Sequence, residues 1–433
     1  MARLFGTDGI RGLAGGDVLT ADLAEQVAAA AAAVLIADRA ARPVVVIGRD
    51  TRPSGPMLEA ASIAGFTAAG CDVVRLGVVP TPVVAFEVQR GAALGLMISA
   101  SHNPAPDNGL KLFATGGGKL TDAQEDAIEA RLGEVRPATT AGRVSDASAS
   151  AYADHLLDSV GSLAGLHVVV DGAEGAASTI APDVYRRAGA TVTAIHCEAD
   201  GAHINDGCGA THPESLAAAV VQHGADIGIA HDGDADRCIV VDATGAVLNG
   251  DQVLGLLALA RKDAELPASD VLVATVMSNL GLVQAMSAAD IEVVQTAVGD
   301  RYVLEAMLAG GYRLGGEQSG HVVMLDHAST GDGSLTALQV MDRVVRTGRT
   351  VAELAAAVTL LPQVLVNVAA PRERAVAPDV LAEVAAQETA LNGAGRVLLR
   401  PSGTEPLVRV MVEAPTQDEA ERVAQHLAAV VSR

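Results

Sequence analysis

The stretch LGLMISASHNPAPDNGLKLF, residues 94–113, contains the pattern from which the fold can be predicted. An uninterrupted apolar run at 94–98 ends in a polar loop, and a second apolar run follows at 109–113. Continuous apolar runs of this kind indicate strands that helices cover on both faces. The loop carries Ser99 and Ser101, and the local sequence does not decide which of the two serines could take part in chemistry.

The same order of parts occurs in three stretches of the chain. PVVVIGRD (43–50), LHVVVDGAEG (166–175) and DVLVATVMSN (270–279) each open such a stretch. Each continues as helix, strand, helix, strand and polar loop, and ends in a short apolar run. The alternation predicts mostly parallel sheets, and the last run predicts one antiparallel strand in each sheet.

The end of the chain follows another order, β, α, β, β, α, which predicts a small α+β domain with an antiparallel sheet. The predicted fold class is therefore α/β. It has three similar α/β domains with mixed, mostly parallel sheets and a small C-terminal α+β domain, arranged around a central cleft. Because ligands bind at the carboxyl ends of parallel strands, the three polar loops should face that cleft. The predicted bounds are 1–150, 151–250, 251–362 and 363–433.

The composition narrows the classes of protein. A net charge of -22 argues against nucleic acid and against anionic membrane surfaces as partners. The four cysteines form no CxxC pair, and the opening MARLFGTDGIRG lacks the apolar segment of a signal peptide. We therefore expect a cytoplasmic protein. Aromatic residues make up only 2% of the chain and tryptophan is absent, so the cores should consist of Ala, Val and Leu.

The loop HDGDADR, residues 231–237, has the strongest chemical signal. Asp232, Asp234 and Asp236 follow one another at every second position, where their oxygens can point at one hard cation. Without a cation, three carboxylates so close together would repel one another. An EF-hand is excluded, because its sixth position would be Arg237 and its twelfth Ala243. The alternative is a solvated acidic turn. We predict a divalent metal ion, and Mg²⁺ fits a site that leaves room for a phosphate.

The segment RPSGTEPLVRV, residues 400–410, suits a phosphate dianion. Arginine forks, hydroxyl groups and a glycine that lets backbone N–H groups approach are the usual donors to phosphate. The alternative is a hairpin turn with a capping serine. The candidate donors are Arg400, Ser402, Gly403, Thr404 and Arg409.

Two further segments carry polar side chains beside glycines. In GGEQSGH (315–321), Glu317, Ser319 and His321 could bond to sugar hydroxyls or to an amine, although a plain glycine-rich connection is the alternative. In FGTDGIRG (5–12), Arg11 could contact an anion. Arg52 in GRDTRPSG (48–55) is expected to be structural.

Ser101 and His102 form a poor hydrolase pair, because neighbouring side chains in an extended segment point apart. The chain also lacks a GxSxG elbow. A serine loop beside a three-aspartate loop suggests a phosphoserine instead, with Mg²⁺ joining the carboxylates to a phosphate oxygen. Lys111 on the returning strand could neutralise charge or poise a hydroxyl, and the alternative is an exposed lysine on an edge strand.

The segments SHNP, DGDADR, GEQSGH and RPSGTEP, in this order, resemble the α-D-phosphohexomutase superfamily. The resemblance covers essentially the whole chain. FGTDGIRG, CGATH (208–212) and VGDRYV (298–303) resemble the branch that acts on glucosamine phosphates rather than those that act on mannose and glucose phosphates.

The resemblance implies a role for each candidate residue. Ser101 would be the phosphoserine and, through its phosphate, a metal ligand beside Asp232, Asp234 and Asp236. Glu317 and Ser319 would bind the sugar, and the segment around Arg400 would hold the non-reacting phosphate. The reaction centre would be lined by Arg11, Lys111, Arg237 and His321, with Lys111 a candidate general acid/base.

The resemblance also implies the reaction. The enzyme would interconvert glucosamine 6-phosphate and glucosamine 1-phosphate through phospho-Ser101 and glucosamine 1,6-bisphosphate. One Mg²⁺ per chain would serve as cofactor, and the product would supply UDP-N-acetylglucosamine for cell-wall synthesis. A homodimer and an activating kinase are compatible with the resemblance. The alternatives are a mutase of neutral hexose phosphates, a non-catalytic sugar-phosphate sensor and a metal-dependent phosphatase.

Overall fold

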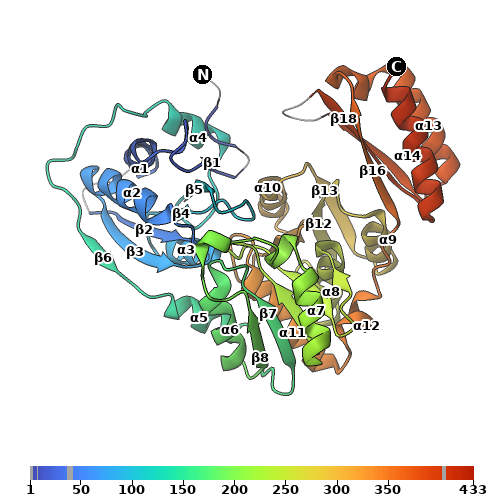
Figure 1. Cartoon of the computed structure of the whole chain (residues 1–433), viewed down its shortest axis with the longest axis horizontal. Coiled ribbons are helices and arrows are strands. Elements are labelled where there is room, and N and C mark those ends of the chain that lie inside the picture. Colours follow the sequence, from blue (N-terminus) through green and yellow to red (C-terminus); the bar gives the residue numbers. More distant parts are fainter. Residues whose placement is uncertain (1–2, 7, 37–41, 402–405) are drawn as a thin grey trace. The chain divides into compact units, whose positions relative to one another are not determined.

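The computed structural model describes residues 3–6, 8–36, 42–401 and 406–433 (Figure 1). The chain forms two compact units. The first comprises Met1–Met277 and Ile291–Ala356, and the second comprises Ser278–Asp290 and Ala357–Arg433. Among the described residues, no helix is long and apolar enough to cross a membrane.

The first sheet contains the stretch at 94–113. β4 (Leu94–Ile98) is wholly buried and parallel to β2 (Val44–Arg49), and β5 (Asp107–Phe113) returns antiparallel to β4. β1 (Ile10–Leu13) pairs with the other side of β5, so β5 is an inner strand. The strand order is β1-β5-β4-β2-β3-β6, with β3 at Asp72–Val78 and β6 at Val144–Asp146. The helices of this part are α1 (Ala21–Leu35), α2 (Gly55–Ala68), α3 (Thr81–Gln89) and α4 (Asp122–Glu129).

Small side chains let α1 and α2 lie side by side (Figure 1). A Cβ atom at Gly65 of α2 would lie 2.2 Å from the Glu25 carbonyl oxygen and 2.9 Å from Ala28 Cβ, both in α1. Only glycine permits this approach. The core beneath these helices is built mainly from Ala, Val, Leu and Ile, close to the expectation from composition. Burying one Val or Leu side chain stabilises the fold by about 1.5–3 kcal/mol.

The second sheet repeats the pattern. β7 (His167–Asp171) lies between β8 (Thr191–Ile195) and β9 (Ile227–Ala230), parallel to both. β10 (Ile239–Asp242) returns antiparallel to β9, and the order is β11-β10-β9-β7-β8 with β11 at Val247–Leu248. The helices of this part are α5 (Ser150–Asp158), α6 (Ala177–Arg187), α7 (Glu214–His223), η1 (Gly201–His203) and η2 (Gly209–Thr211).

The third sheet has the order β13-β12-β14-β15. β12 (Val271–Thr275) is parallel to β13 (Glu292–Thr296) and β14 (Leu314–Gly316), and β15 (Val322–Met324) is antiparallel to β14. Asn249 starts the first helix of this part through a capping box with Gln252. The helices are α8 (Gly250–Asp263), α10 (Asp300–Gly310), α11 (Gly333–Thr347) and α12 (Val351–Ala355).

The second unit is an antiparallel sheet of order β16-β18-β17 with helices on one face (Figure 1). It also includes α9 (Leu280–Ala288), whose sequence lies between β12 and β13. The Leu280 amide donates to Glu413 Oε2 at 2.9 Å, which ties α9 to the C-terminal strand. The elements are β16 (Gln363–Ala369), η3 (Arg372–Val376), α13 (Pro378–Leu391), β17 (Arg396–Pro401), β18 (Leu407–Glu413) and α14 (Gln417–Val431).

The predicted architecture is confirmed. Three mixed sheets each carry strands that return antiparallel after a polar loop, and a small antiparallel α+β part follows, within the ranges that the structure describes. The membership of α9 was not predicted, because the strand and helix pattern around it is the same as in the two earlier stretches.

Candidate active site

The three polar loops meet inside the first unit. Ser101, after β4, places its Oγ 2.5 Å from Asp232 Oδ2, after β9. Arg237, at the end of the aspartate loop, forms an antiparallel β-bridge with His321. The structure thus brings together the loops that the repeated pattern predicted to face one another.

The loop after β4 is held from below by a buried ion pair. Arg52 and Asp50 are both fully buried, and Arg52 Nε donates to Asp50 Oδ2 at 2.9 Å. Ser99 Oγ donates to Asp50 Oδ2 at 2.6 Å and accepts the Ser101 amide at 2.9 Å. Arg52 Nη2 donates to the Ser101 carbonyl at 2.9 Å. Ser99 and Arg52 therefore support the loop, and Ser101 presents its hydroxyl to the aspartates.

The expectation that Ser101 and His102 point apart is wrong. Ser101 has φ 54°, in the left-handed region rather than extended. This conformation brings its Oγ within 3.3 Å of His102 Nδ1. Burial, together with the nearby charges of Arg237 and Arg11, lowers the pKa of His102 to about 4. His102 is therefore neutral at pH 7 and can accept a hydrogen bond.

The aspartate loop is buried and fixed by its backbone. Asp232, Asp234 and Asp236 each offer one oxygen, and these oxygens lie within 4.8 Å of one another. The Thr81 amide donates to the Asp234 carbonyl at 2.9 Å, and the Gly333 amide donates to the Ala235 carbonyl at 3.0 Å. Ordered backbone contacts hold the three carboxylates close together in spite of their repulsion.

The donor set fits a hard divalent cation. Asp234 Oδ1 and Asp236 Oδ1 are buried, and no described residue offers either of them a hydrogen bond. Burial, together with repulsion from Asp236 and Asp234, raises the pKa of Asp232 to about 7. Unpartnered carboxylate oxygens that repel one another are the arrangement that a bound Mg²⁺ relieves.

Lys111 lies among these carboxylates. Its Nζ is 2.7 Å from Asp234 Oδ2, 2.9 Å from Asp8 Oδ2 and 3.6 Å from Asp236 Oδ2. The residue is 3% exposed on an inner strand, so the alternative of an exposed edge lysine is wrong. Burial would lower the pKa of Lys111, but Asp234, Asp8 and Asp236 outweigh it and raise the pKa. Lys111 is therefore a fixed positive charge.

A buried network beside Lys111 was missed at the level of sequence. Lys119 Nζ donates to Asp8 Oδ1 at 2.6 Å and forms a close ion pair with Asp300. Asp300 Oδ2 also lies 3.4 Å from His321 Nε2. Asp8 and Asp300 belong to FGTDGIRG and VGDRYV, two segments that carry the family resemblance and could have indicated these residues. Lys119 follows three glycines, and no pattern in the sequence singled it out.

Arg11, Arg237 and His321 surround the carboxylates. Arg11 Nη2 donates to Asp8 Oδ2 at 2.5 Å. Arg237 Nε lies 3.8 Å from Asp232 Oδ2, and His321 Nδ1 lies 3.7 Å from Asp236 Oδ1. Burial would lower the pKa of His321, but the carboxylates raise it. These cations balance part of the negative charge of the aspartate loop.

Two buried side chains position the aspartate loop from behind. His231 is fully buried, and its Nδ1 contacts the Arg237 carbonyl at 2.9 Å. Its Nε2 contacts Tyr185 Oη at 2.8 Å. With the ring nitrogens taken up in this way, Nδ1 donates to the carbonyl and Nε2 accepts from Tyr185. The bond from His231 to the Arg237 carbonyl joins the two ends of the aspartate loop. No pattern in the sequence indicated a role for Tyr185.

Glu317 and Ser319 lie on the turn between β14 and β15. Glu317 Oε1 accepts the Gly299 amide at 3.1 Å, which braces the start of α10. Ser319 Oγ is buried, and no described group bonds to it. The turn therefore has one hydroxyl free for a ligand, while one oxygen of Glu317 has a structural contact.

The predicted phosphate-binding residues lie in the second unit. Arg400 and Arg409 are directly opposite each other on β17 and β18. Side chains at such positions share one face of the sheet, and two like charges there repel. Ser402, Gly403 and Thr404 lie outside the described residues.

The class of protein follows from the comparison with protein families. Models of the phosphoglucomutase/phosphomannomutase family match alpha/beta/alpha domains I, II and III at residues 2–138, 150–245 and 249–360. The model of its C-terminal domain matches residues 365–430. The chain belongs to this family, and the predicted superfamily is confirmed. The predicted class of enzyme, an isomerase that transfers a phosphoryl group, is confirmed with it.

The similar relatives carry a more specific name. A phosphoglucosamine mutase of Saccharopolyspora erythraea is 58% identical over 442 residues, covering 100% of this chain and 99% of the relative. A phosphoglucosamine mutase of Thermobifida fusca is 57% identical over 443 residues, covering 100% and 98%.

Solved structures share the whole fold. A phosphoglucomutase/phosphomannomutase family protein of Burkholderia thailandensis has a TM-score of 0.83 at 25% identity, covering 99% of this chain and 97% of that chain. A putative phosphomannomutase of Thermus thermophilus has a TM-score of 0.80 at 26% identity, covering 100% of both chains.

Proposed function

We propose that this chain interconverts glucosamine 6-phosphate and glucosamine 1-phosphate, the reaction of a phosphoglucosamine mutase. The observation that carries the proposal is the 2.5 Å contact between Ser101 Oγ and Asp232, within a group of buried carboxylates that have unpartnered oxygens. The full-length relatives at 57–58% identity support the choice of an amino sugar.

Ser101 carries the phosphoryl group in this proposal. In the first half-reaction the bond from phosphorus to Ser101 Oγ breaks, and a bond from phosphorus to a sugar hydroxyl forms. One proton leaves the sugar hydroxyl, and one reaches Ser101 Oγ. The product, glucosamine 1,6-bisphosphate, then turns over and returns its other phosphoryl group to Ser101.

Asp232, Asp234 and Asp236 would hold one Mg²⁺ per chain. When bound, Mg²⁺ neutralises phosphate charge and makes phosphorus more electrophilic. Lys111 and Arg237 add fixed positive charge among buried carboxylates, and such charge stabilises a phosphoryl transition state most where it is shielded from solvent. Because the raised pKa of Lys111 keeps it protonated, we assign it charge stabilisation ahead of general acid/base chemistry.

The remaining candidates bind the ends of the substrate. Ser319 Oγ and Glu317 would contact the sugar, and Arg11 and His321 would line the reaction centre. Arg400 and Arg409 would hold the non-reacting phosphate, together with Ser402, Gly403 and Thr404. A phosphate between the two facing arginines would relieve their repulsion, which supports this assignment.

The organisation of the chain belongs to the proposal as well. We propose domain bounds at 150, 250 and 362, and the ranges of the family models support them. We propose a cytoplasmic enzyme, supported by the lack of a disulfide among the four cysteines, all of which lie in the described ranges. The homodimer and the activating kinase stay predictions.

Ser101→Ala tests the proposal directly. We expect turnover to fall by at least about a thousandfold, because the variant has no oxygen to carry the phosphoryl group. Binding of glucosamine 6-phosphate, measured by calorimetry, should persist. Ser145→Ala, on the exposed β6, is the matched control and should keep full turnover. Full turnover in Ser101→Ala would refute the proposal.

Coupled assays with glucosamine, glucose and mannose 6-phosphates test the choice of substrate. We expect the highest kcat/KM with glucosamine 6-phosphate. A higher value with glucose or mannose 6-phosphate would favour the mutase of neutral hexose phosphates. Release of inorganic phosphate faster than isomerisation would favour a phosphatase.

A further inference from the structure

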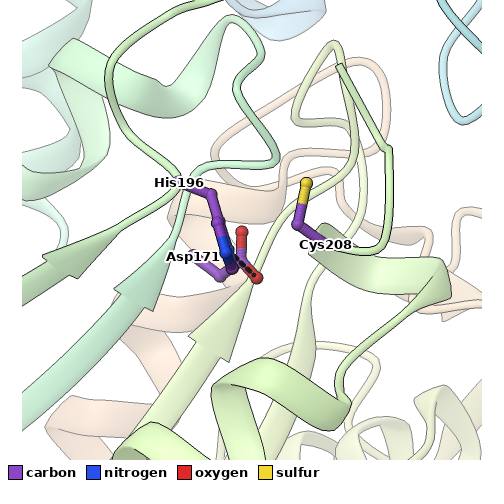
Figure 2. A group of neighbouring side chains, drawn as sticks. All are labelled: Asp171, His196 and Cys208. Carbon is purple, nitrogen blue, oxygen red and sulfur yellow. Dashed lines mark hydrogen bonds and ion pairs between the residues drawn. The ribbon is translucent and has the colours of Figure 1, made fainter. Parts of the chain in front are cut away.

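A second group of potential metal ligands lies beside the second sheet, at the edge where the aspartate loop follows β9. Asp171, His196 and Cys208 each offer one donor atom, and these atoms lie within 4.8 Å of one another (Figure 2). Asp171 is fully buried and Cys208 is 2% exposed. The group combines oxygen, nitrogen and sulfur, whereas the aspartate loop offers oxygen alone.

Strand register brings the three residues together. Asp171 is the last residue of β7 and pairs with Ile195, the last residue of the parallel β8. His196 follows Ile195, so its ring comes to lie beside the Asp171 carboxylate (Figure 2). Cys208 is the N-cap of η2, and the next amide, that of Gly209, donates to Asp171 Oδ2 at 3.0 Å.

Backbone contacts fix the Asp171 carboxylate in advance. The Ala173 amide donates to Oδ1 at 2.8 Å, and the Gly209 amide donates to Oδ2. Carboxylates that ligate metals are commonly held by such hydrogen bonds. Each carboxylate oxygen has two lone pairs, so Oδ2 can also ligate a cation in place of its contact with His196.

The spacing suits a tetrahedral ion. His196 Nδ1 lies 3.0 Å from Asp171 Oδ2. Two oxygen or nitrogen ligands on one zinc ion, each at about 2.0–2.1 Å, lie about 3.3 Å apart. The His196 side chain is 33% exposed, so an ion can enter and a water molecule can fill a fourth position.

The Cys208 thiol can become a metal ligand when it loses its proton. Its Sγ makes a long contact of 4.0 Å with the His203 carbonyl. Burial, together with the negative charges of Asp171 and Glu174, raises the pKa of the thiol to about 12. A neutral thiol is a poor nucleophile, and a bound cation favours the thiolate.

We propose that Asp171, His196 and Cys208 form a second metal site, for a borderline transition-metal cation such as Zn²⁺. Asp171 Oδ2, His196 Nδ1 and Cys208 Sγ are the ligands, and water completes the tetrahedron. On binding, the thiol proton passes to solvent. A protonated His196 ring also releases its Nδ1 proton to solvent, whereas a neutral ring exchanges it through solvent for a proton on Nε2, so that Nδ1 ligates as a neutral imidazole. The donor set selects Zn²⁺ over Mg²⁺, because sulfur and imidazole nitrogen suit the softer ion.

The site shares a loop with the proposed active site. Asn205, three residues before Cys208, donates Nδ2 to the carbonyls of Ser101 at 3.0 Å and Asn103 at 3.1 Å. A metal ion on Cys208 therefore anchors one end of a loop whose middle supports Ser101. The proposal does not depend on the proposed reaction, since it concerns binding by residues outside the reaction centre.

Titration of the full-length protein with Co²⁺, in excess Mg²⁺ to fill the aspartate loop, tests the site. We expect one additional Co²⁺ per chain, with the near-ultraviolet charge-transfer band of a cobalt–thiolate bond. Zn²⁺ should abolish the band by competition. Zn²⁺ should also raise the melting temperature, because an ion that binds only the folded chain stabilises it.

Matched variants distinguish a ligand from a structural contact. Cys208→Ala and His196→Gln should lose the band and the thermal shift with Zn²⁺, while Cys71→Ala and His223→Gln should keep both. Absence of a thiolate band in the wild-type protein would overturn the proposal. Persistence of the band in Cys208→Ala would overturn it as well, since another cysteine would then be the ligand.

Discussion

An aspartate lies at or just beyond the end of each of two neighbouring strands of the second sheet. The two carboxylates are equally buried but have different hydrogen-bond partners. Asp171 is the last residue of β7, and both of its oxygens accept backbone amides. Asp234, in the loop after β9, has one buried oxygen without a partner among the described residues. In one sheet, the same residue type thus has both oxygens satisfied by backbone amides in one place, and in the other has one oxygen paired with Lys111 and one left without a hydrogen bond from any described residue.

The difference shows how burial alone misleads. A buried carboxylate with its hydrogen bonds satisfied costs the fold little, and it fixes the turns around it. A cluster of buried carboxylates with unpartnered oxygens is unfavourable until a cation arrives. A cluster of this kind is retained where binding of a ligand offsets its free-energy cost. The aspartate loop is for this reason the better candidate for chemistry.

Asp232→Asn should have the largest effect. The amide oxygen can still accept from Ser101 Oγ, but the charge that attracts Mg²⁺ is lost. We expect kcat to fall by at least about a thousandfold, with a higher Mg²⁺ requirement. Steady-state assays across a Mg²⁺ titration measure both. Asp183→Asn, on an exposed position of α6, should behave as wild type. A kcat of Asp232→Asn equal to that of the wild type would contradict a functional role for the buried carboxylates of the aspartate loop.

The contribution of Asp232 to the stability of the metal-free protein should fall as pH rises from about 4 to 7. The folded pKa of Asp232, about 7, lies above the ordinary value of 3.8, so the folded state binds the extra proton in this window. At about 1.4 kcal/mol per pKa unit, the loss reaches up to about 4 kcal/mol. Urea unfolding in a chelator measures it. Asp232→Asn should lack this part of the pH dependence, and an identical slope in both proteins would contradict the assignment.

Asp171→Asn should destabilise the chain by about 2–3 kcal/mol. Its oxygen can still accept from the Ala173 amide, but the NH2 group in place of Oδ2 cannot accept from the Gly209 amide or from His196. The urea midpoint should fall clearly, whereas that of Asp183→Asn should not. At pH 7.5 the urea midpoint should fall less in Asp232→Asn than in Asp171→Asn. The reverse order would show that the satisfied carboxylate is not the structural one.

His196→Gln should have the smallest effect. Its hydrogen bond with Asp171 raises the pKa of His196 above the ordinary 6.5, so the pair stabilises the fold below that pH and loses this contribution as pH rises through the folded pKa. Because the side chain is 33% exposed, we expect the substitution to lower the free energy of unfolding of the metal-free protein by about 0.5–1 kcal/mol at pH 5.5. At pH 9 the loss should be close to zero. Unfolding midpoints at the two pH values test the sign, and a loss that grows with pH would contradict it.

Much of the active site could be predicted because its residues cluster within short segments. The aspartate triplet and the serine loop each follow a buried strand, and alternating strands and helices place such loops at one edge of a sheet. Lys111 was correctly placed on the returning strand, but its burial was not foreseen. That burial depends on β1, which pairs with β5 from almost a hundred residues away along the chain and makes it an inner strand.

The sequence by itself determined the strands, the repeated order of parts and the residue types in each polar loop, because these depend on local periodicity and spacing. Tertiary structure decided which side chains meet. It placed Lys119 between Asp8 and Asp300, turned Ser101 toward His102 and gathered Asp171, His196 and Cys208. Such contacts join segments distant in sequence, and only the packing of whole sheets and loops brings them within bonding distance.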